Sequence, residues 1–296
     1  MGKIAFVFSG QGDQFPGMGK DMYETYPAAQ KIFEQCDKIR PGTSAQCFHG
    51  TEEELKETGN TQPCLFAMEL AAASVLMEKG IAPDAVAGFS LGEVVAATVC
   101  GAFDNETGFR LVCKRGELMQ SESEKFDTSM AAVVKLAPDQ LQEVCDQYSD
   151  VYPVNFNCPG QITVSGLSSQ MADFFSDVKA AGGRAIPLKV KGAFHSPFMK
   201  AAAAAFAVEL EKAEVKDRHI MLYSNLTAEV YTDDVTGLLS KQICSPVQWE
   251  KIIRNMIADG VDTFIEIGPG KTLTNMIRKI CADVKAISIT EYLAEG

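Results

Sequence analysis

The chain has 296 residues, of which 46% are hydrophobic and 22% charged, and its formal net charge is −12. This composition is typical of a soluble globular protein with a substantial buried core, and the length favours one large domain with an insert over two equal domains. The acidic balance argues against nucleic acid as a partner, because a nucleic-acid-binding domain presents a basic face.

The sequence carries no sign of a membrane or targeting segment. No apolar run approaches the roughly 20 residues of a membrane-spanning helix, and the first residues lack the pattern of a signal peptide. The nine cysteines are scattered and contain no C-x-x-C pair, which favours mostly buried thiols over disulfides or a metal site. We therefore expect a cytoplasmic protein that has no membrane association and binds no metal.

The first half of the chain is predicted to alternate between strands and helices. Short apolar runs indicate buried strands, and the second of them leads directly into Gly88. Asn60 or Thr61 is the expected cap of the longest helix. Strands are predicted over residues 3–8 and 85–87, and helices over residues 28–39, 61–79, 91–100 and 104–123.

The middle of the chain has a different order of elements, strand-helix-strand-strand-helix-strand. That order over roughly 65 residues is typical of a small ferredoxin-like domain. Because helices and strands alternate again afterwards, we predict one doubly wound α/β domain (residues 1–126 and 194–296) interrupted by an insert (residues 127–193). The insert is expected to contain strands 130–136, 151–157, 161–165 and 184–190 and helices 138–147 and 168–181; the clearest later elements are 220–224, 262–267 and a final helix from residue 271.

A G-x-S-x-G pattern at Gly88–Gly92 lies between a predicted strand and a predicted helix. A sharp strand-to-helix turn exposes its serine at the carboxyl edge of the sheet, and free N–H groups at the start of the helix face a developing oxyanion. A purely structural turn is the alternative. The strand–turn–helix context favours Ser90 as a nucleophile.

A serine nucleophile needs a base, and the chain has only three histidines. His49 lies in a predicted polar loop and His219 follows three charged residues, so we expect both at the surface. His195 precedes Ser196 and Pro197, a good helix cap and first helical residue, and would project from the loop after the insert. We favour His195 as the base, although a structural histidine is the simpler alternative.

Gln11 and Arg115 have two interpretations each. Gln11 follows the first strand in a glycine-rich segment, where its backbone N–H could pair with that of Leu91 as an oxyanion hole. A phosphate loop is the alternative, but G-x-G-x-x-G and the P-loop lysine are absent. Arg115 is flanked by apolar residues on its helix, so it either covers apolar surface with its head in water or presents a desolvated guanidinium to a carboxylate.

Together these residues resemble the malonyl-CoA:acyl carrier protein transacylases of fatty-acid and polyketide synthesis. The match runs along nearly the whole chain and keeps its motifs in a fixed order. The motifs are G-Q-G (10–12), P-G-M-G (16–19), T-Q-P (61–63), S-L-G-E (90–93), R-G-E-L-M-Q (115–120), N-x-P-G-Q (157–161), G-A-F-H-S (192–196), P-V-Q-W (246–249) and E-I-G-P-G (266–270).

The resemblance implies a hydrolase-like three-layer α/β domain with a ferredoxin-like insert. It also implies that Ser90 carries the acyl group as an ester and that His195 is the base. The remaining implied roles are a carbonyl at Gln248 that orients the histidine, oxyanion N–H groups at Gln11 and Leu91, a carboxylate clamp at Arg115, and substrate contacts at Phe194, Phe89 and Asn157.

The implied partners are malonyl-CoA as a substrate and an acyl carrier protein as the acceptor, with no cofactor and a monomeric enzyme. A CoA phosphate or an acidic carrier would need a local basic patch, for which Lys189, Lys191 and Lys114 are candidates. The chain departs from the family at Phe89, where histidine is usual, and at Asp13, where a small residue is common. The first departure puts the polar surroundings of the acyl pocket in question.

Other functions remain open at this level. A serine hydrolase on the same fold is the main alternative, but an ordinary hydrolase would need an acid after a late strand, and an editing hydrolase would lack Arg115. A trans-acting acyltransferase of polyketide synthesis is a second alternative. A non-catalytic docking module is a third, and the complete set of site residues disfavours it.

Overall fold

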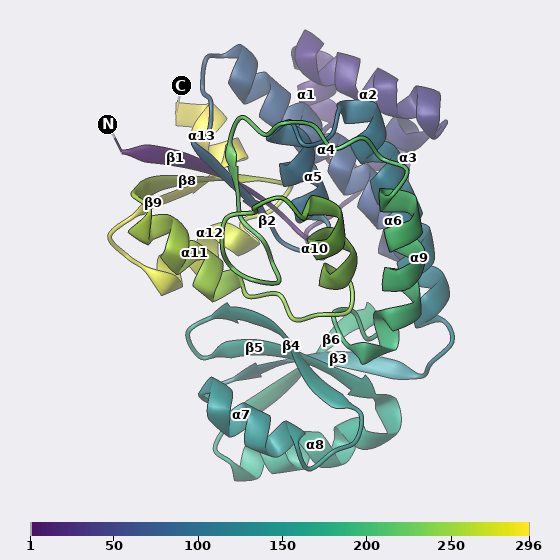
Figure 1. The fold of residues 1–296 in the computed structure, drawn as a ribbon, viewed down its shortest axis with the longest axis vertical. Helices are drawn as coiled ribbons and strands as arrows, with labels where there is room; N and C mark the ends of the chain where they lie inside the picture. Colours follow the sequence, from purple (N-terminus) through teal and green to yellow (C-terminus); the bar gives the residue numbers. More distant parts are fainter. Residues whose placement is uncertain (1, 296) are drawn as a thin grey trace.

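The computed structural model describes residues 2–295, apart from the side chains of Lys189, Lys191 and Glu295. It contains two sheets (Figure 1). The first has five parallel strands in the order β7-β2-β1-β8-β9, and the second has four antiparallel strands in the order β4-β5-β3-β6. The strands are β1 (Lys3–Phe8), β2 (Ala85–Gly88), β3 (Thr128–Val134), β4 (Val151–Cys158), β5 (Gln161–Leu167), β6 (Arg184–Lys191), β7 (Met221–Leu222), β8 (Val261–Ile267) and β9 (Lys285–Ser288).

Helices pack on both sheets, and two short 3-10 turns (Glu54–Lys56 and Pro197–Met199) accompany them. The mixed α/β class, the parallel sheet and the second sheet predicted from the sequence are confirmed. The helices are α1 (Lys20–Thr25), α2 (Pro27–Ile39), α3 (Thr43–His49), α4 (Thr58–Glu78), α5 (Gly92–Val99), α6 (Asn105–Ser123), α7 (Pro138–Cys145), α8 (Ser168–Ala180), α9 (Lys200–Leu210), α10 (Val235–Gln242), α11 (Trp249–Ala258), α12 (Thr272–Ile280) and α13 (Ile289–Glu295).

The first sheet is covered on both faces, because alternate residues of a strand point to opposite sides. In β1, Phe6 and Phe8 join an apolar cluster with α4, α5 and α6, whereas Ala5 and Val7 join a second cluster with α11 and α12. This burial on both sides explains the continuous apolar runs of β1 and β2. Because β1 and β2 are parallel neighbours, their carboxyl ends lie at the same edge of the sheet, where the turn at Ser90 begins.

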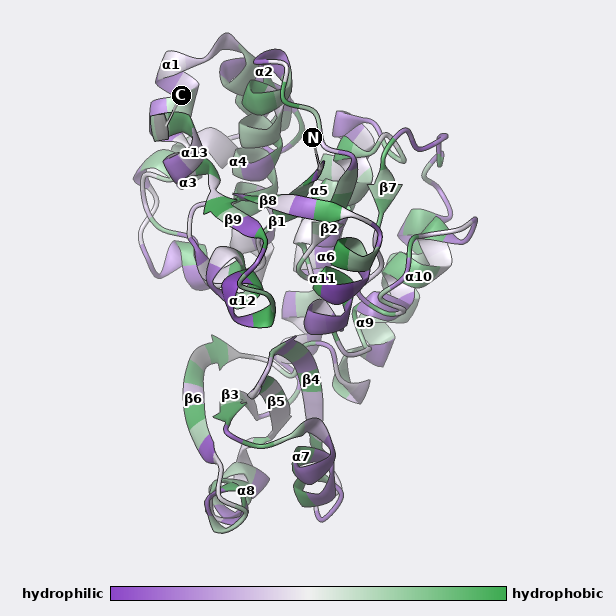
Figure 2. Ribbon diagram, turned by 90° about the vertical axis from the view of Figure 1, so that its left-hand side faces the viewer, coloured by the Kyte–Doolittle hydropathy of each residue, from purple (hydrophilic) through white to green (hydrophobic). Residues whose placement is uncertain are grey.

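The two helices that alternate with the strands of the second sheet lie on one of its faces. Its elements follow in the order β3-α7-β4-β5-α8-β6, and α7 and α8 share an apolar cluster with its strands. Figures 1 and 2 show these two helices on the side of the sheet that faces away from the rest of the molecule. The opposite face is turned toward the first sheet, and α11 and α12 contact β4.

The longest helix, α4, begins at Thr58, three residues earlier than predicted, and neither Asn60 nor Thr61 caps it. The residue before it makes no side-chain cap hydrogen bond. Instead, Gln120 of α6 accepts a hydrogen bond of 2.8 Å from the backbone N–H of Gly59. A side chain from a distant helix thus satisfies a donor of the first turn, which local sequence signals do not reveal.

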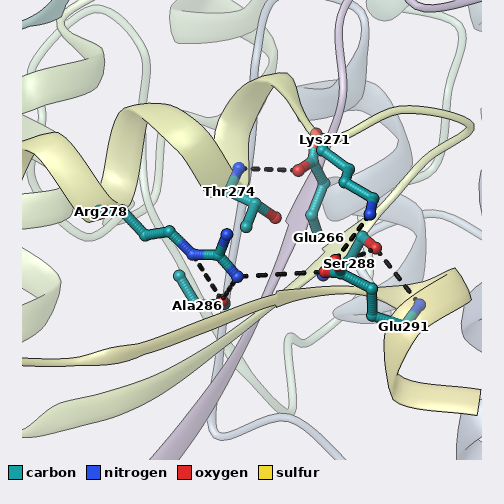
Figure 3. Close-up of polar contacts among 7 residues, drawn as sticks. All are labelled: Glu266, Lys271, Thr274, Arg278, Ala286, Ser288 and Glu291. Atoms are coloured by element: carbon teal, nitrogen blue, oxygen red, sulfur yellow. Dashed lines mark hydrogen bonds and ion pairs between the residues drawn. The ribbon is translucent and has the colours of Figure 1, made fainter.

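The sequence suggested that helix α12 is the final element, but β9 and α13 follow it in the structure. A polar cluster ties these elements to the sheet (Figure 3). Glu266 at the end of β8 accepts hydrogen bonds from backbone N–H groups in the first turn of α12. Arg278 of α12 donates to the Ala286 carbonyl in β9 at 3.2 and 2.8 Å, and Lys271 lies 2.6 Å from Glu291 in α13.

All nine cysteines are free thiols, six of them buried and three half-buried, which confirms the expectation of mostly buried thiols. Across residues 2–295, none of the helices combines the length and apolar character needed to cross a bilayer.

Candidate active site

Ser90 lies at the tip of a strand-to-helix turn between β2 and α5, with a backbone φ of 56°. The turn is so tight that its two glycines admit no side chain. A Cβ atom on Gly88 would lie 1.8 Å from the carbonyl carbon of Gly92, and one on Gly92 would lie 2.4 Å from the Phe8 carbonyl oxygen. The G-x-S-x-G spacing therefore follows from the packing of this turn against the end of β1.

Asn225 holds the turn from the neighbouring chain segment. Its Oδ1 accepts a hydrogen bond of 2.8 Å from the Ser90 backbone N–H, and its Nδ2 donates to the Gly88 carbonyl at 2.6 Å. Both bonds favour the left-handed backbone at Ser90, a conformation that costs free energy for a residue other than glycine. Asn225 was not predicted from the sequence, where its signal is that of a polar residue shortly after β7, at the carboxyl edge of the sheet.

The Ser90 hydroxyl contacts His195. The two atoms Oγ and Nε2 are 2.7 Å apart, although the residues are 105 positions apart in the chain. The other ring nitrogen, Nδ1, lies 2.9 Å from the backbone carbonyl oxygen of Gln242. Because a carbonyl only accepts hydrogen bonds, Nδ1 carries the proton and Nε2 is free to accept the proton of Ser90.

This geometry corrects the expectation for Gln248. The carbonyl that orients His195 belongs to Gln242, six positions earlier, whereas the backbone N–H of Gln248 donates to the Asn225 carbonyl at 3.0 Å. Gln242 closes helix α10, and Gln248 precedes helix α11. Only the relative placement of those two helices decides which carbonyl reaches the imidazole.

His195 is buried and is held in a left-handed backbone conformation with φ of 61°. Its backbone N–H donates to the Ile243 carbonyl at 3.1 Å. Burial, followed by the nearby charge of Arg115, lowers the pKa of His195 to about 4. The imidazole is therefore neutral at physiological pH, as a general base must be.

Arg115 is fully buried, which excludes the interpretation that its head lies in water. Its Nη2 donates to the Ser90 hydroxyl at 3.1 Å and to Gln242 Oε1 at 2.7 Å, and its Nη1 donates to Gln62 Oε1 at 2.8 Å. The Nε atom has no hydrogen-bond partner among the residues described. Burial lowers the pKa of Arg115 to about 10, against the opposing charge of Glu93, so the side chain remains a cation beside the nucleophile.

The backbone N–H groups of Gln11 and Leu91 have no hydrogen-bond acceptor within residues 2–295. Leu91 is the N-cap of α5, and Gln11 follows β1 in the adjacent loop. Both residues line one cavity together with Ser90. The structure thus brings Gln11 and Leu91 to the cavity that holds Ser90, and neither backbone N–H is engaged in a described hydrogen bond.

The cavity at Ser90 is small, about 100 Å³, and a larger hollow of about 610 Å³ adjoins it between the two sheets. Phe194 lines the small cavity, Asn157 lines the hollow and Phe89 lines both. The Phe89 ring packs edge-to-face against the Trp249 ring, with the two ring centroids 5.6 Å apart. The small cavity is lined by Gln11, Gln62, Phe89, Ser90, Leu91, Met119, Met130, Asn155, Thr163, Leu188, Val190, Phe194 and His195.

The other histidines lie at the surface, as expected, but His49 is the last residue of helix α3 and not part of a loop. The side chains of Lys189 and Lys191, two candidates for a basic patch, lie outside the described part of the structure. Lys114 lies on the exposed side of α6 and pairs with Glu117 at 3.2 Å. Among the residues described, no group of three or more histidine, cysteine, aspartate or glutamate side chains could hold a metal ion.

The comparisons with known proteins agree with each other. A family model described as an acyl transferase domain matches residues 5–294. A Bacillus subtilis protein named malonyl CoA-acyl carrier protein transacylase is 40% identical over 300 residues, covering 98% of this chain and 94% of that protein. The crystal structure of a Clostridium perfringens protein of the same name superposes with a TM-score of 0.95 at 33% identity and covers 99% and 96% of the two chains.

A further solved structure contains a holo acyl carrier protein of a type II polyketide synthase in complex with its malonyl-transacylase. The matched chain superposes with a TM-score of 0.93 at 32% identity, covering 99% of this chain and all of that one.

Proposed function

Because the chain belongs to the family of acyl transferase domains, we propose that it transfers a malonyl group from CoA to the phosphopantetheine thiol of an acyl carrier protein. The group would be held in between as an ester of Ser90. The observation that carries this proposal is a buried guanidinium, that of Arg115, 3.1 Å from a serine hydroxyl that also contacts a neutral histidine.

In the first half-reaction, Ser90 Oγ attacks the thioester carbonyl carbon of malonyl-CoA while His195 Nε2 takes the hydroxyl proton. The carbonyl oxygen becomes an oxyanion, which the N–H groups of Gln11 and Leu91 stabilise. When the intermediate collapses, the C–S bond breaks, and His195 returns the proton to the departing CoA sulfur. The product is the malonyl ester of Ser90.

In the second half-reaction, the thiol of the carrier protein attacks the ester carbonyl and gives its proton to His195. The C–O bond to Ser90 breaks and the same proton returns to Oγ, which restores the starting enzyme. Because CoA leaves before the carrier thiol attacks the Ser90 ester, the reaction follows ping-pong order. The hollow of about 610 Å³ between the two sheets provides room for the pantetheine arm of either substrate.

Selectivity for an acyl group with a carboxylate comes from Arg115. A guanidinium binds a carboxylate through two parallel hydrogen bonds, and burial strengthens the interaction. The small cavity, about 100 Å³, disfavours bulky acyl groups. We propose that Phe194 and Phe89 form apolar walls of this acyl site and that Asn157 contacts the pantetheine arm.

We also assign the molecule to two structural classes. Residues 1–126 and 194–296 form the hydrolase-like domain, supported by the parallel sheet between two helix layers. Residues 127–193 form the ferredoxin-like domain, supported by the order β3-α7-β4-β5-α8-β6 and the strand order β4-β5-β3-β6. We further propose that the protein is a cytoplasmic monomer that binds neither nucleic acid nor membranes and needs no cofactor. This part of the proposal rests on composition and family resemblance alone.

Mass spectrometry of the protein mixed with malonyl-CoA tests the central step. We expect a malonyl adduct on the peptide that contains Ser90 and no adduct on Ser90→Ala; equal labelling of the variant would refute the assignment. The released products then separate transferase from hydrolase. A transferase delivers malonyl to the carrier thiol faster than it releases free malonate, and the reverse order would indicate a hydrolase.

A further inference from the structure

Glu93 is a buried carboxylate close to the site, but its described hydrogen bonds do not reach the reacting groups. It lies in the first turn of α5, three positions after Ser90, and is fully buried. Its Oε1 accepts hydrogen bonds from the Asn225 backbone N–H at 2.8 Å and from the Tyr231 hydroxyl at 2.7 Å. Its Oε2 accepts from Gln242 Nε2 at 2.7 Å.

Gln242 connects this carboxylate to the site. Its Nε2 also donates to the Ser90 backbone carbonyl at 2.7 Å, and its Oε1 accepts from Arg115 Nη2 at 2.7 Å. A third, longer bond runs from Nε2 to Asn225 Oδ1 at 3.4 Å. Acceptors on one side and a guanidinium donor on the other permit only one orientation of the amide. Without the negative charge of Glu93, the amide loses the one charged acceptor among those that fix this orientation.

The same chain of hydrogen bonds brings a negative charge near Arg115 without a direct ion pair. The partners of the guanidinium are all uncharged: Gln62, Gln242 and the Ser90 hydroxyl. A carboxylate bound directly to Arg115 would occupy the N–H groups that a substrate needs. Placing the carboxylate one amide further away stabilises the buried cation and leaves it accessible to the acyl group.

We propose that Glu93 is a positioning residue that acts through Gln242 to fix the guanidinium of Arg115 for the carboxylate of the acyl group and to hold the turn that carries Ser90. This inference rests on the proposed malonyl transfer. If the unmodified protein forms no malonyl ester, the proposed function fails; if it does, the variants below test Glu93 alone.

The first test compares Glu93→Gln with the unmodified enzyme in single-turnover ester formation. The variant keeps the shape of the side chain but removes its charge and directs an NH₂ group at the NH₂ group of Gln242. We expect kcat/KM for malonyl-CoA to fall about tenfold more than that for acetyl-CoA, the loss typical of one charge-assisted hydrogen bond. Equal losses for both substrates, or no loss, would overturn the proposal.

Glu266→Gln is the matched control. Glu266 is also fully buried and also accepts backbone hydrogen bonds, at 3.0 and 2.7 Å, but it holds the start of α12 and has no contact with Gln242 among its hydrogen bonds. We expect it to lower the melting temperature while the malonyl-to-acetyl ratio stays unchanged. A similar fall of the ratio in this control would mean that any buried charge loss disturbs the site, which contradicts a specific role for Glu93.

A double-mutant cycle tests whether Glu93 acts through Gln242. If it does, the Glu93→Gln/Gln242→Leu double variant is no less selective for malonyl-CoA than Gln242→Leu alone, because the connection is already broken. Additive losses in the double variant would show that Glu93 acts by another route.

Tyr231→Phe keeps the proposal testable if Glu93→Gln does not fold. Burial raises the pKa of Glu93 to about 7, and the hydrogen bonds of Tyr231, Asn225 and Gln242 and the charge of Arg115 oppose this rise. Of the groups that act on Glu93, Tyr231 and Arg115 are titratable. His195, with a pKa of about 4, stays neutral between pH 7 and 9, where the test is made.

Removing the Tyr231 hydroxyl raises the pKa of Glu93 further, so more of the carboxyl is protonated at neutral pH. We expect the malonyl preference of Tyr231→Phe to be reduced at pH 7 and restored near pH 9, with the midpoint above that of the unmodified enzyme. An unchanged pH profile of the preference in the folded variant would contradict the proposal.

Discussion

The imidazole Nδ1 of His195 lies 2.9 Å from the backbone carbonyl oxygen of Gln242, so the candidate base is oriented by the main chain and not by a carboxylate. A carbonyl cannot be protonated in the physiological range, and no side-chain substitution removes it. The orientation of His195 therefore depends on the position of the end of α10, which the Gln242 side chain also helps to fix.

Substitutions at Gln242 and Gln248 are expected to have opposite outcomes. Gln242→Leu keeps the carbonyl but removes the hydrogen bonds to Arg115, the Ser90 carbonyl and Glu93, so ester formation from malonyl-CoA should slow at least about tenfold. Gln248→Leu keeps its backbone N–H bond and should stay within about twofold, since its side chain makes no hydrogen bond among the residues described. Stopped-flow release of CoA measures both; a larger effect at Gln248 would argue against the role assigned to the Gln242 side chain.

Arg115→Met should convert the enzyme from a malonyl-selective to an unselective one. Hydrogen bonds to charged groups contribute about 1.5–3 kcal/mol each, so we expect kcat/KM for malonyl-CoA to fall about 100-fold and that for acetyl-CoA much less. Arg110→Met on the same helix is the matched control, because Arg110 is exposed and its ion pair within residues 2–295 is with Glu106. Parallel losses for both substrates in Arg115→Met would reduce the arginine to a structural role.

The pH profile of the rate of ester formation should have the midpoint of its acid limb well below 6.5, the ordinary pKa of histidine. His195 must be neutral to act, and its pKa is lowered to about 4, so activity is present above that pH and is lost as the pH falls through it. The charge of Arg115 is one cause of this shift, so Arg115→Met should raise the pKa of His195 and move the limb upward. Burst amplitudes with acetyl-CoA between pH 4 and 8 measure both limbs, and coincident limbs would contradict the assigned cause.

Asn225→Ala should reduce both stability and the rate of ester formation. It removes the two hydrogen bonds that hold the turn at Ser90 and leaves a buried N–H without a partner, at a cost of about 2–3 kcal/mol. Asn255→Ala, which removes a bond of 2.9 Å to the Ala228 carbonyl, is the control that should affect stability only. Urea denaturation and single-turnover labelling measure the two quantities. If Asn225→Ala labels at the normal rate, the turn does not need this support.

Much of the fold and part of the site were predictable from local patterns. The strands 3–8 and 85–87 and the alternation of elements on either side of the insert follow from hydrophobic periodicity. The turn at Ser90 was recognisable from the G-x-S-x-G spacing between a strand and a helix. With only three histidines in the chain, the choice of His195 over two exposed alternatives was also accessible. Elements such as β9 and α13, after the expected last helix, were not anticipated.

By itself the sequence indicated the nucleophile turn and the two kinds of sheet, because each depends on local patterns, and it favoured His195 as the base because the other two histidines were expected at the surface. Only the tertiary structure decided that Arg115 is buried rather than exposed, that Gln242 and not Gln248 orients His195, and that Glu93 and Asn225 support the turn. Gln242 is 152 positions from Ser90 and Asn225 is 135. Contacts of that range depend on how whole helices pack against one another, and no local pattern records the outcome of that packing.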